Sequence, residues 1–301
     1  MYFQVTSGLI TSCLQRSKSI PDHIMALKSA ASESLIDWND PAWTMQEAFF
    51  LFCNLHAHVD HHMITDPQTI IERALLIEQM LAPTFDSPPQ GWLPKIVYTD
   101  KDPDLVFAGY YHRYSDYQHA QLWNGARCIR IMLHGMIHEA LDKGYLSASR
   151  VFTANFYATQ RQRSTEIIQI MIADILASVP QHLGYCPTKS TEKSAHDTPL
   201  APRFIWSNFD SFFPWDLSEN VNVPLIRGTG AYLLPWAMYL AGSLGTTGTR
   251  SWVLNNLKLV GSTLGIRQAY FLAHVLELNK GFGPGQDSQV PTDVTDAVDE
   301  T

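Results

Sequence analysis

The sequence contains little charge. Only 17% of its 301 residues are Asp, Glu, Lys or Arg, and 46% are hydrophobic, whereas about a quarter of residues are charged in typical soluble proteins. The net charge is −8, and Arg161 with Arg163 is the nearest approach to a basic cluster. Nucleic-acid backbones are bound by clustered Lys and Arg, so this composition argues against a general nucleic-acid-binding surface. It favours extensive burial and a surface that contacts a partner.

Paired cysteines and long apolar runs are also lacking. The four cysteines, Cys13, Cys53, Cys128 and Cys186, are scattered without C-x-x-C spacing, which predicts free thiols in a reducing intracellular compartment. The first twenty residues lack the basic start and apolar core of a secretory signal. In the charge-free stretch 228–249, the apolar part covers only 231–244, which is shorter than the roughly 18 to 20 residues of a membrane span. We therefore expect a core helix there and no membrane association.

Alternating strand patterns are scarce, and helical periodicity dominates. The longest helical stretch is 114–141, where apolar residues recur at steps of three or four and cover most of the helix circumference. Such a helix is buried by other helices. Arg127 and Arg130 lie inside it, so other parts of the chain must supply acids or carbonyls to pair with them. Lys143 and Gly144 are expected to end this helix.

The remaining periodic stretches make the expected fold all-α, a multi-helix bundle. Asp40-Pro41 and Asp66-Pro67 are typical helix starts, with Asp at the cap and Pro in the first turn. The other helices are expected over 23–36, 42–58, 70–81, 164–179, 229–244, 249–264 and 266–280.

Prolines divide the chain. Pro83 and Pro180 are expected to end the helices that precede them. The proline-bearing stretch 83–103 is expected to be a loop or linker, 187–202 a mobile surface loop, and 203–224 has no clear assignment. The predicted organisation is an N-terminal helical part with a Pro-rich connector (1–104), a helical core (105–281), and an acidic disordered tail (282–301) with five acidic residues and no basic one.

One short motif resembles a metal site. His56, His58, Asp60 and His61 form the pattern H-x-H-x-D-H, which is the metal-binding signature of metallo-β-lactamase-like hydrolases. Imidazoles and a carboxylate in that family hold metals that activate a water molecule. The family places the motif after a strand in a sheet-rich sandwich, whereas helical patterns flank it here. A metal-dependent hydrolase is therefore the alternative function, and a solvated helix end is the simpler interpretation.

Other catalytic patterns are not found. His134 and His138 are one helical turn apart, but their order is not H-E-x-x-H, so we expect a buried or partly buried pair rather than zinc ligands. Arg130, four residues before His134, favours a neutral imidazole. The sequence has no G-x-S-x-G, phosphate-cradling loop or dinucleotide fingerprint. We assign no catalytic, cofactor-binding or metal-binding residue.

Four strings occur in order across about residues 105–278. They are Leu122-Trp123-Asn124 with Arg127, Arg130-Ile131 and Leu133-His134; Ile172-Ala173-Asp174-Ile175 with Ala177-Ser178-Val179-Pro180 and His182-Leu183-Gly184; Gly230-Ala231-Tyr232-Leu233-Leu234-Pro235-Trp236 with Tyr239-Leu240-Ala241-Gly242; and Arg250-x-Trp252 with Leu257, Gly261, Gly265-Ile266 and Gln268-Ala269. Together they resemble the regulatory domain of fungal transcription factors of the binuclear zinc-cluster type. In that family the third string more usually has Trp before Pro, so the order here is inverted.

The resemblance implies an all-helical regulatory core over 105–281, nuclear location, and control of transcription of metabolic gene sets, including secondary metabolism. It implies no catalytic residues. The family's DNA reader, six closely spaced cysteines on two zinc ions followed by a basic stretch, has no counterpart in these residues, because Cys13 stands alone. We therefore do not expect the chain to read DNA directly. We expect it to act through a protein partner.

The partner is expected to be a full-length zinc-cluster factor or a second copy of this chain. Two related possibilities remain open. The sequence is a truncated relative or an incomplete gene model of such a factor, or it is a scaffold or inhibitor that sequesters a full-length relative by domain pairing.

Overall fold

The computed structural model describes residues 10, 12–14, 16–26, 40–115, 117–147, 150–183 and 234–278. These residues are mostly helical, which confirms the all-α fold class. The elements are α3 (Pro41–Asp60), α4 (Pro67–Asp86), β1 (Lys95–Tyr98), the 3-10 turn η1 (Phe107–Gly109), β2 (Tyr110–Arg113), α5 (Tyr117–Leu146), α6 (Ala154–His182), α8 (Leu234–Leu244), α9 (Thr247–Leu264) and α10 (Arg267–Leu278).

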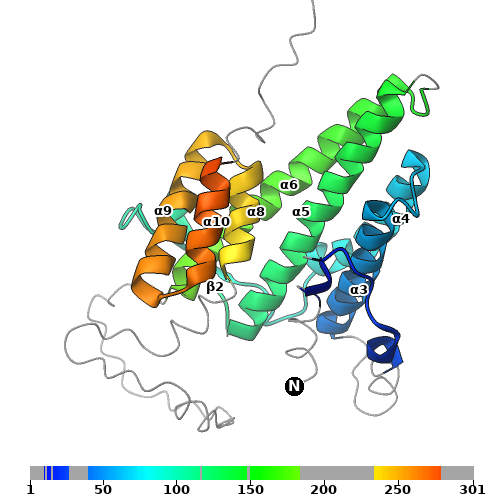
Figure 1. Ribbon diagram of the computed structural model, residues 1–301. Helices are drawn as coiled ribbons and strands as arrows, with labels where there is room; N and C mark the ends of the chain where they lie inside the picture. Colours follow the sequence, from blue (N-terminus) through cyan, green and yellow to red (C-terminus); the bar gives the residue numbers. More distant parts are fainter. Residues whose placement is uncertain are drawn as a thin grey trace, which may run out of the picture.

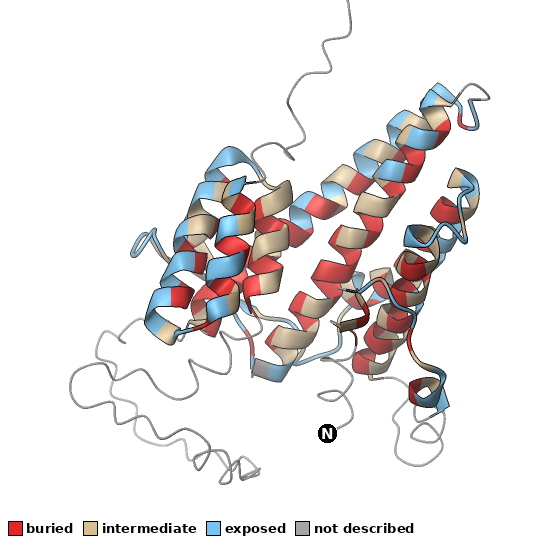
Figure 2. Ribbon diagram, viewed as in Figure 1, coloured by how far each residue is buried: buried red, intermediate tan, exposed pale blue. Residues whose placement is uncertain are grey.

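Helices α5 and α6 form the centre of the molecule. They pack side by side, with α3 and α4 against α5 on one side and α8 on the other (Figure 1). Helices α9 and α10 pack against α8 and against each other. Buried residues follow the inward faces of these helices (Figure 2). One apolar cluster joins α3, α4 and α5, and the other joins α5, α6 and α8 to α10. Helix α5 contributes to both clusters, as its wide apolar face predicted.

The aspartate caps are confirmed at two helix starts. Asp40 Oδ1 accepts a hydrogen bond from the amide of Ala42 at 2.9 Å, and Asp66 Oδ2 accepts one from the amide of Thr69 at 2.8 Å. In each helix a proline follows the cap at the first position, where it lacks only an N–H that has no partner inside the helix. The local sequence therefore sets where α3 and α4 begin.

The expected stop at Gly144 is wrong, because α5 continues to Leu146. A Cβ atom at residue 144 would lie 2.3 Å from Cε2 of Phe152, so the missing side chain makes room for this ring. Phe152 is buried, and the amide of Val151 donates to the carbonyl of Gly144 at 3.0 Å. Here the glycine serves a close contact between chain segments and does not end the helix.

The stops at Pro83 and Pro180 are also wrong. Both prolines lie inside their helices, α4 and α6. A proline in the last turn removes a single helical hydrogen bond, and packing can offset that loss. After Pro83, Phe85 packs edge-on against Trp123 with ring centroids 4.9 Å apart. After Pro180, His182 is buried, and its Nδ1 lies 3.1 Å from the carbonyl oxygen of Ser178.

Helix α6 also begins ten residues before the expected position 164. Thr153 caps it, since its Oγ1 accepts a hydrogen bond from the amide of Phe156 at 3.2 Å. The first turns of α6 carry polar and aromatic residues without a continuous apolar stripe. Periodicity therefore detected only the part of the helix that enters the core.

A two-stranded antiparallel sheet lies partly within the stretch expected to be a loop. Lys95 pairs with Arg113 and Tyr98 with Tyr110. Strand β2 packs against α6, and β1 is largely exposed. Four-residue strands are too short to produce a clear alternating pattern, which explains why the sequence did not predict them.

The closing helices agree with expectation where they are described. Helix α9 ends at Leu264, and Gly265 follows in the left-handed region with φ 68°. No helix among the described residues is long and apolar enough to cross a membrane. The loop 187–202, most of 23–36, the stretch 229–233 and the tail 282–301 lie outside the described residues. The division into parts at residue 104 stays a prediction.

Trp123 provides a test of the central packing. Its side chain is 3% exposed, and its Nε1 donates to the carbonyl of Trp92 at 2.9 Å. We expect Trp123→Ala to lower the free energy of unfolding by about 3 to 5 kcal/mol. Phe271→Ala is the control, because Phe271 is 65% exposed and its loss should change stability little. Urea unfolding of both variants measures the change. An unchanged urea midpoint for Trp123→Ala would contradict this packing.

Candidate functional site

The polar interior of α5 is the main concentration of chemistry among the described residues. Arg130 is 6% exposed and Glu78 of α4 is 3% exposed. Arg130 Nε donates to Glu78 Oε2 at 3.0 Å, and Nη2 donates to Oε1 of the same carboxylate. The guanidinium also lies over the ring of Phe85, 4.3 Å from its centroid. The expected partner for a buried arginine is therefore a bidentate carboxylate from the preceding helix.

His134 joins this pair to α6. Its Nε2 lies 3.4 Å from Glu78 Oε2, and its Nδ1 lies 3.0 Å from the hydroxyl of Ser164. Burial raises the pKa of Glu78, but the nearby His134 and the hydrogen bonds and charge of Arg130 lower it by more, so the net pKa is below the ordinary value. The carboxylate is therefore charged, and the contacts from Glu78 through His134 to Ser164 link α4, α5 and α6.

The order Ser164, His134, Glu78 resembles a Ser-His-acid triad, but it cannot work as one. In catalytic triads the serine faces Nε2 and the acid faces Nδ1, and here these contacts are reversed. Ser164 and His134 are both 0% exposed, so no substrate reaches the hydroxyl. Gln160 Nε2 also donates to Ser164 Oγ at 3.2 Å. The cluster is a structural link between helices.

Arg127 lies one turn earlier on α5 and faces α6. Its Nη1 donates to Asn124 Oδ1 at 3.0 Å, and its Nη2 lies 3.3 Å from Asp174 Oδ2. Asn124 Nδ2 in turn donates to the hydroxyl of Ser178 at 2.8 Å. Arg127 is 2% exposed, so this pairing supplies the acid that its burial requires.

Two histidines border the Arg127 group. Burial, together with the positive charge of Arg127, lowers the pKa of His112 to about 4, although Asp174 opposes this shift. Burial also lowers the pKa of His182 to about 4, against the hydrogen bond with the Ser178 carbonyl. Both imidazoles are therefore neutral near pH 7.

The H-x-H-x-D-H motif lies at the end of α3. His56, His58 and Asp60 are in its last turns, and His61 is its C-cap. Helix α4 follows, so both flanks are helical, as expected. His61 Nε2 lies 2.7 Å from the carbonyl oxygen of Ser17. Within the described residues, no three His, Cys, Asp or Glu side chains gather where they could hold a metal ion.

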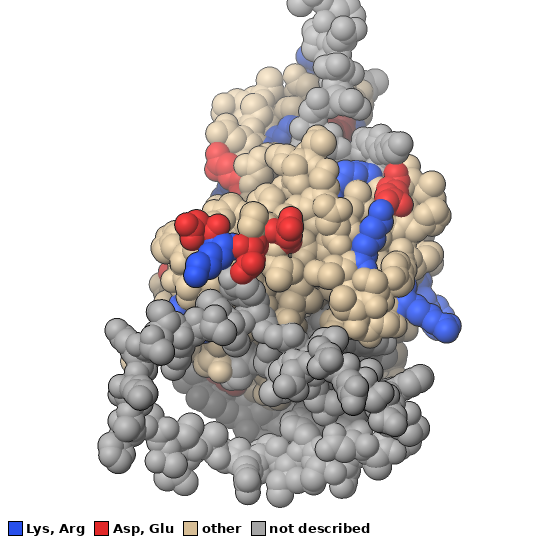
Figure 3. Space-filling view, turned by 90° about the vertical axis from the view of Figure 1, so that its left-hand side faces the viewer, with Lys and Arg blue, Asp and Glu red and all other residues tan. Residues whose placement is uncertain are grey.

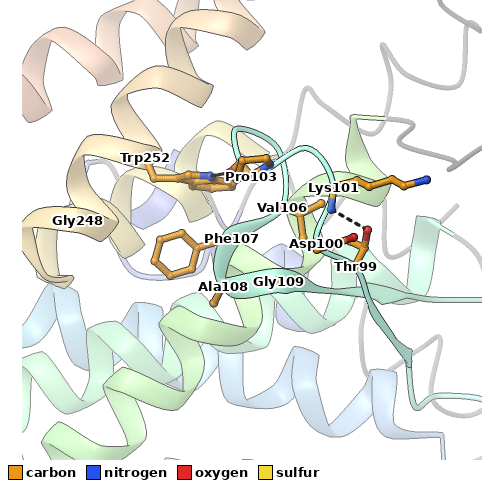
Figure 4. Close-up of a pocket in the computed structure, with 10 residues that line it drawn as sticks. All are labelled: Thr99, Asp100, Lys101, Pro103, Val106, Phe107, Ala108, Gly109, Gly248 and Trp252. Carbon is orange, nitrogen blue, oxygen red and sulfur yellow. Dashed lines mark hydrogen bonds between the residues drawn. The ribbon is translucent and has the colours of Figure 1, made fainter.

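A pocket of about 400 Å³ lies on the surface between the β1–β2 connection and the start of α9 (Figure 4). Phe107 and Trp252 provide its aromatic walls, with ring centroids 5.4 Å apart. The connection is fixed to α9 by two side chains. Trp252 Nε1 donates to the carbonyl of Pro103 at 3.1 Å, and Asn256 Nδ2 donates to that of Asp104 at 2.8 Å.

Sequence reasoning missed this pocket, because it predicted no hairpin. It also missed the identity of the acids that pair with the two arginines. A signal for Glu78 existed: it is the one acidic residue at a core position of the apolar stripe 70–81. Asp174 lies within the second string. Its position in the sequence does not reveal that it contacts Arg127 on another helix.

The sequence matches no protein-family model, no curated protein and no solved structure. The resemblance to fungal regulatory domains therefore rests on the four strings alone.

The Glu78–Arg130 pair predicts a specific pattern of stability. Glu78→Gln leaves Arg130 buried without a charged partner, and we expect it to lower the free energy of unfolding by about 3 to 5 kcal/mol. Replacing both partners by apolar residues, Glu78→Leu with Arg130→Met, should recover most of that loss, because no unpaired charge remains. Urea unfolding measures both. A double variant less stable than Glu78→Gln would contradict the account.

The two buried histidines predict acid sensitivity. Their pKa is about 4 in the folded protein and about 6.5 when unfolded, so between these values the unfolded chain binds more protons. Stability must then fall as the pH falls from about 6.5 to 4, by up to about 1.4 kcal/mol per pH unit for each histidine. Below that range, protonation of Glu78 removes further stability.

The measurement is the free energy of unfolding at several pH values. His182→Asn should reduce the slope of the free energy of unfolding against pH by up to about 1.4 kcal/mol per pH unit between pH 4 and 6.5. His62→Asn is the control, because His62 is exposed and its φ of 57° is one that asparagine tolerates. Equal slopes for the native protein and His182→Asn would contradict the assignment.

Proposed function

We propose that this chain is a transcription-regulator-like helical domain that acts in the nucleus through protein contacts, and that it controls a metabolic gene set. The observation that carries the proposal is the ordered series of four strings. Most of their polar members on α5 and α6 lie between these two helices, and Arg130 pairs with Glu78 of α4. Asn124, Arg127, Arg130, His134, Ser178 and His182 are all buried. The burial of these side chains agrees with a role of the strings in building the domain. The family that they resemble has no catalytic residues in its regulatory domain.

The fourth string has a similar role on α9. Arg250 Nη2 donates to the carbonyl of Leu276 on α10, and Trp252 is bonded to the β1–β2 connection. Gly261 lies under the ring of Tyr270, where a Cβ atom would be 2.8 Å from ring carbons. Each of these residues joins α9 to a neighbouring segment, which supports an architectural reading of the string.

The surface favours a protein partner over DNA. Tyr270, Phe271 and Leu278 of α10 are large apolar residues that are 48%, 65% and 68% exposed. On the side that Figure 3 displays, Lys and Arg are scattered, and several stand beside Asp or Glu. Among the ion pairs of the closing helices, Lys258 Nζ of α9 lies 2.5 Å from Glu277 Oε1 of α10. Contact through apolar side chains agrees with these features better than contact with phosphates.

A tethering assay tests the proposal. The chain is fused to an unrelated DNA-binding module in a fungal host with a matching reporter gene. We expect the fusion to change reporter transcription relative to the module alone. Phe271→Glu with Leu278→Glu should reduce that effect without loss of thermal stability. Leu146→Glu is the control, because Leu146 is 80% exposed at the far end of α5.

Two outcomes would contradict the proposal. One is reporter output equal to that of the DNA-binding module alone, with the fusion expressed and nuclear. The other is stoichiometric zinc in the purified protein that is lost in His58→Ala, which would support the hydrolase alternative instead.

A further inference from the structure

The pocket beside α9 is an open surface hollow that is large enough for a small molecule. Its volume of about 400 Å³ lies within the usual range for such sites, about 300 to 1,000 Å³. Two segments far apart in the sequence form it, the β1–β2 connection and the first turns of α9 (Figure 4). Apolar side chains supply most of its lining, among them Val106, Phe107 and Trp252.

Three polar groups at the pocket already have partners within the protein. The indole N–H of Trp252 donates to Pro103, and the hydroxyl of Thr99 accepts from the amide of Lys101 at 3.1 Å. The amide of Thr99 donates to the carbonyl of Gly109 at 2.9 Å. A ligand that fills the pocket therefore gains its binding free energy chiefly by burying apolar surface.

The charges at the rim balance each other. Asp100 and Lys101 both line the pocket and are exposed, and in Figure 4 the Lys101 side chain extends away from Trp252. A charged ligand would gain attraction from one of them and repulsion from the other, both screened by solvent. The lining therefore offers no net preference for a cation or an anion.

We propose that this pocket binds an uncharged, ring-shaped apolar small molecule between the β1–β2 connection and α9. Phe107 and Trp252 pack edge-to-face against each other at an interplanar angle of 66°, and both line the pocket. A flat ring makes favourable contacts with aromatic side chains of this kind. The bound molecule would strengthen the attachment of the β1–β2 connection to α9. The proposal does not depend on the regulatory role proposed above.

Gly248 offers a position from which a larger side chain can fill the pocket. It lines the pocket in the first turn of α9, and a Cβ atom there would meet nothing closer than Thr246 Oγ1 at 3.9 Å. A leucine at this position has room for its first atom and would extend into the pocket volume. Gly135 of α5 is the matched control, because a Cβ atom there meets nothing within 4 Å and the pocket is remote.

The test uses the uncharged fluorescent dye N-phenyl-1-naphthylamine with the full chain. We expect its emission to rise saturably with one site on the native protein and on Gly135→Leu. Binding to Gly248→Leu should be weaker by about tenfold or more, since the variant occupies the space of a ring. If Gly248→Leu does not fold, Phe107→Leu serves instead, because it removes one aromatic wall.

Competition tests the chemical class. Benzyl alcohol should displace the dye at lower concentration than benzoate or benzamidinium. Saturating dye should also raise the melting temperature of the native protein but not that of Gly248→Leu. The proposal is overturned if native protein shows no saturable binding, if Gly248→Leu binds equally well, or if either charged competitor is the strongest.

Discussion

The burial of Arg127 and Arg130 on one helix constrains the arrangement of the other helices. A guanidinium cannot lose its charge at accessible pH, so each requires an acid or carbonyl inside the protein. Glu78 comes from α4 and Asp174 from α6. The two pairs point in different directions around α5, and they therefore fix the helices on both of its sides. Such pairs contribute more to a unique arrangement than to net stability, because desolvation offsets most of the attraction.

The role of α5 in both apolar clusters has a consequence for function. A domain built around one shared helix encloses many of its polar side chains between neighbouring helices. The Ser164–His134–Glu78 series illustrates this, since a catalytic-looking order of side chains is fully enclosed. Among the described residues, the exposed apolar side chains of α10 and the pocket beside α9 lie at the surface instead.

The sequence predicted those features that local interactions decide. Asp40 and Asp66 cap helices through their own side chains, so their positions could be predicted from two residues each. The need of Arg127 and Arg130 for buried partners followed from their apolar surroundings. That the helices continue past Pro83, Gly144 and Pro180 could not be predicted. Packing by Phe85, Phe152 and His182 outweighs the local preference for ending there. The pocket could not be predicted because it joins residues about 150 positions apart, through bonds such as Trp252 to Pro103.

The central claim is that α4, α5 and α6 form one cooperative unit held at the Glu78–Arg130–His134 cluster. Native-state hydrogen exchange of backbone amides tests it most directly. The account predicts that amides around Glu78 in α4 share the slow exchange class, and the denaturant dependence, of those around Arg130 in α5. Exchange near Glu78 that is orders of magnitude faster, with little denaturant dependence, would mean that α4 opens independently and would contradict the claim.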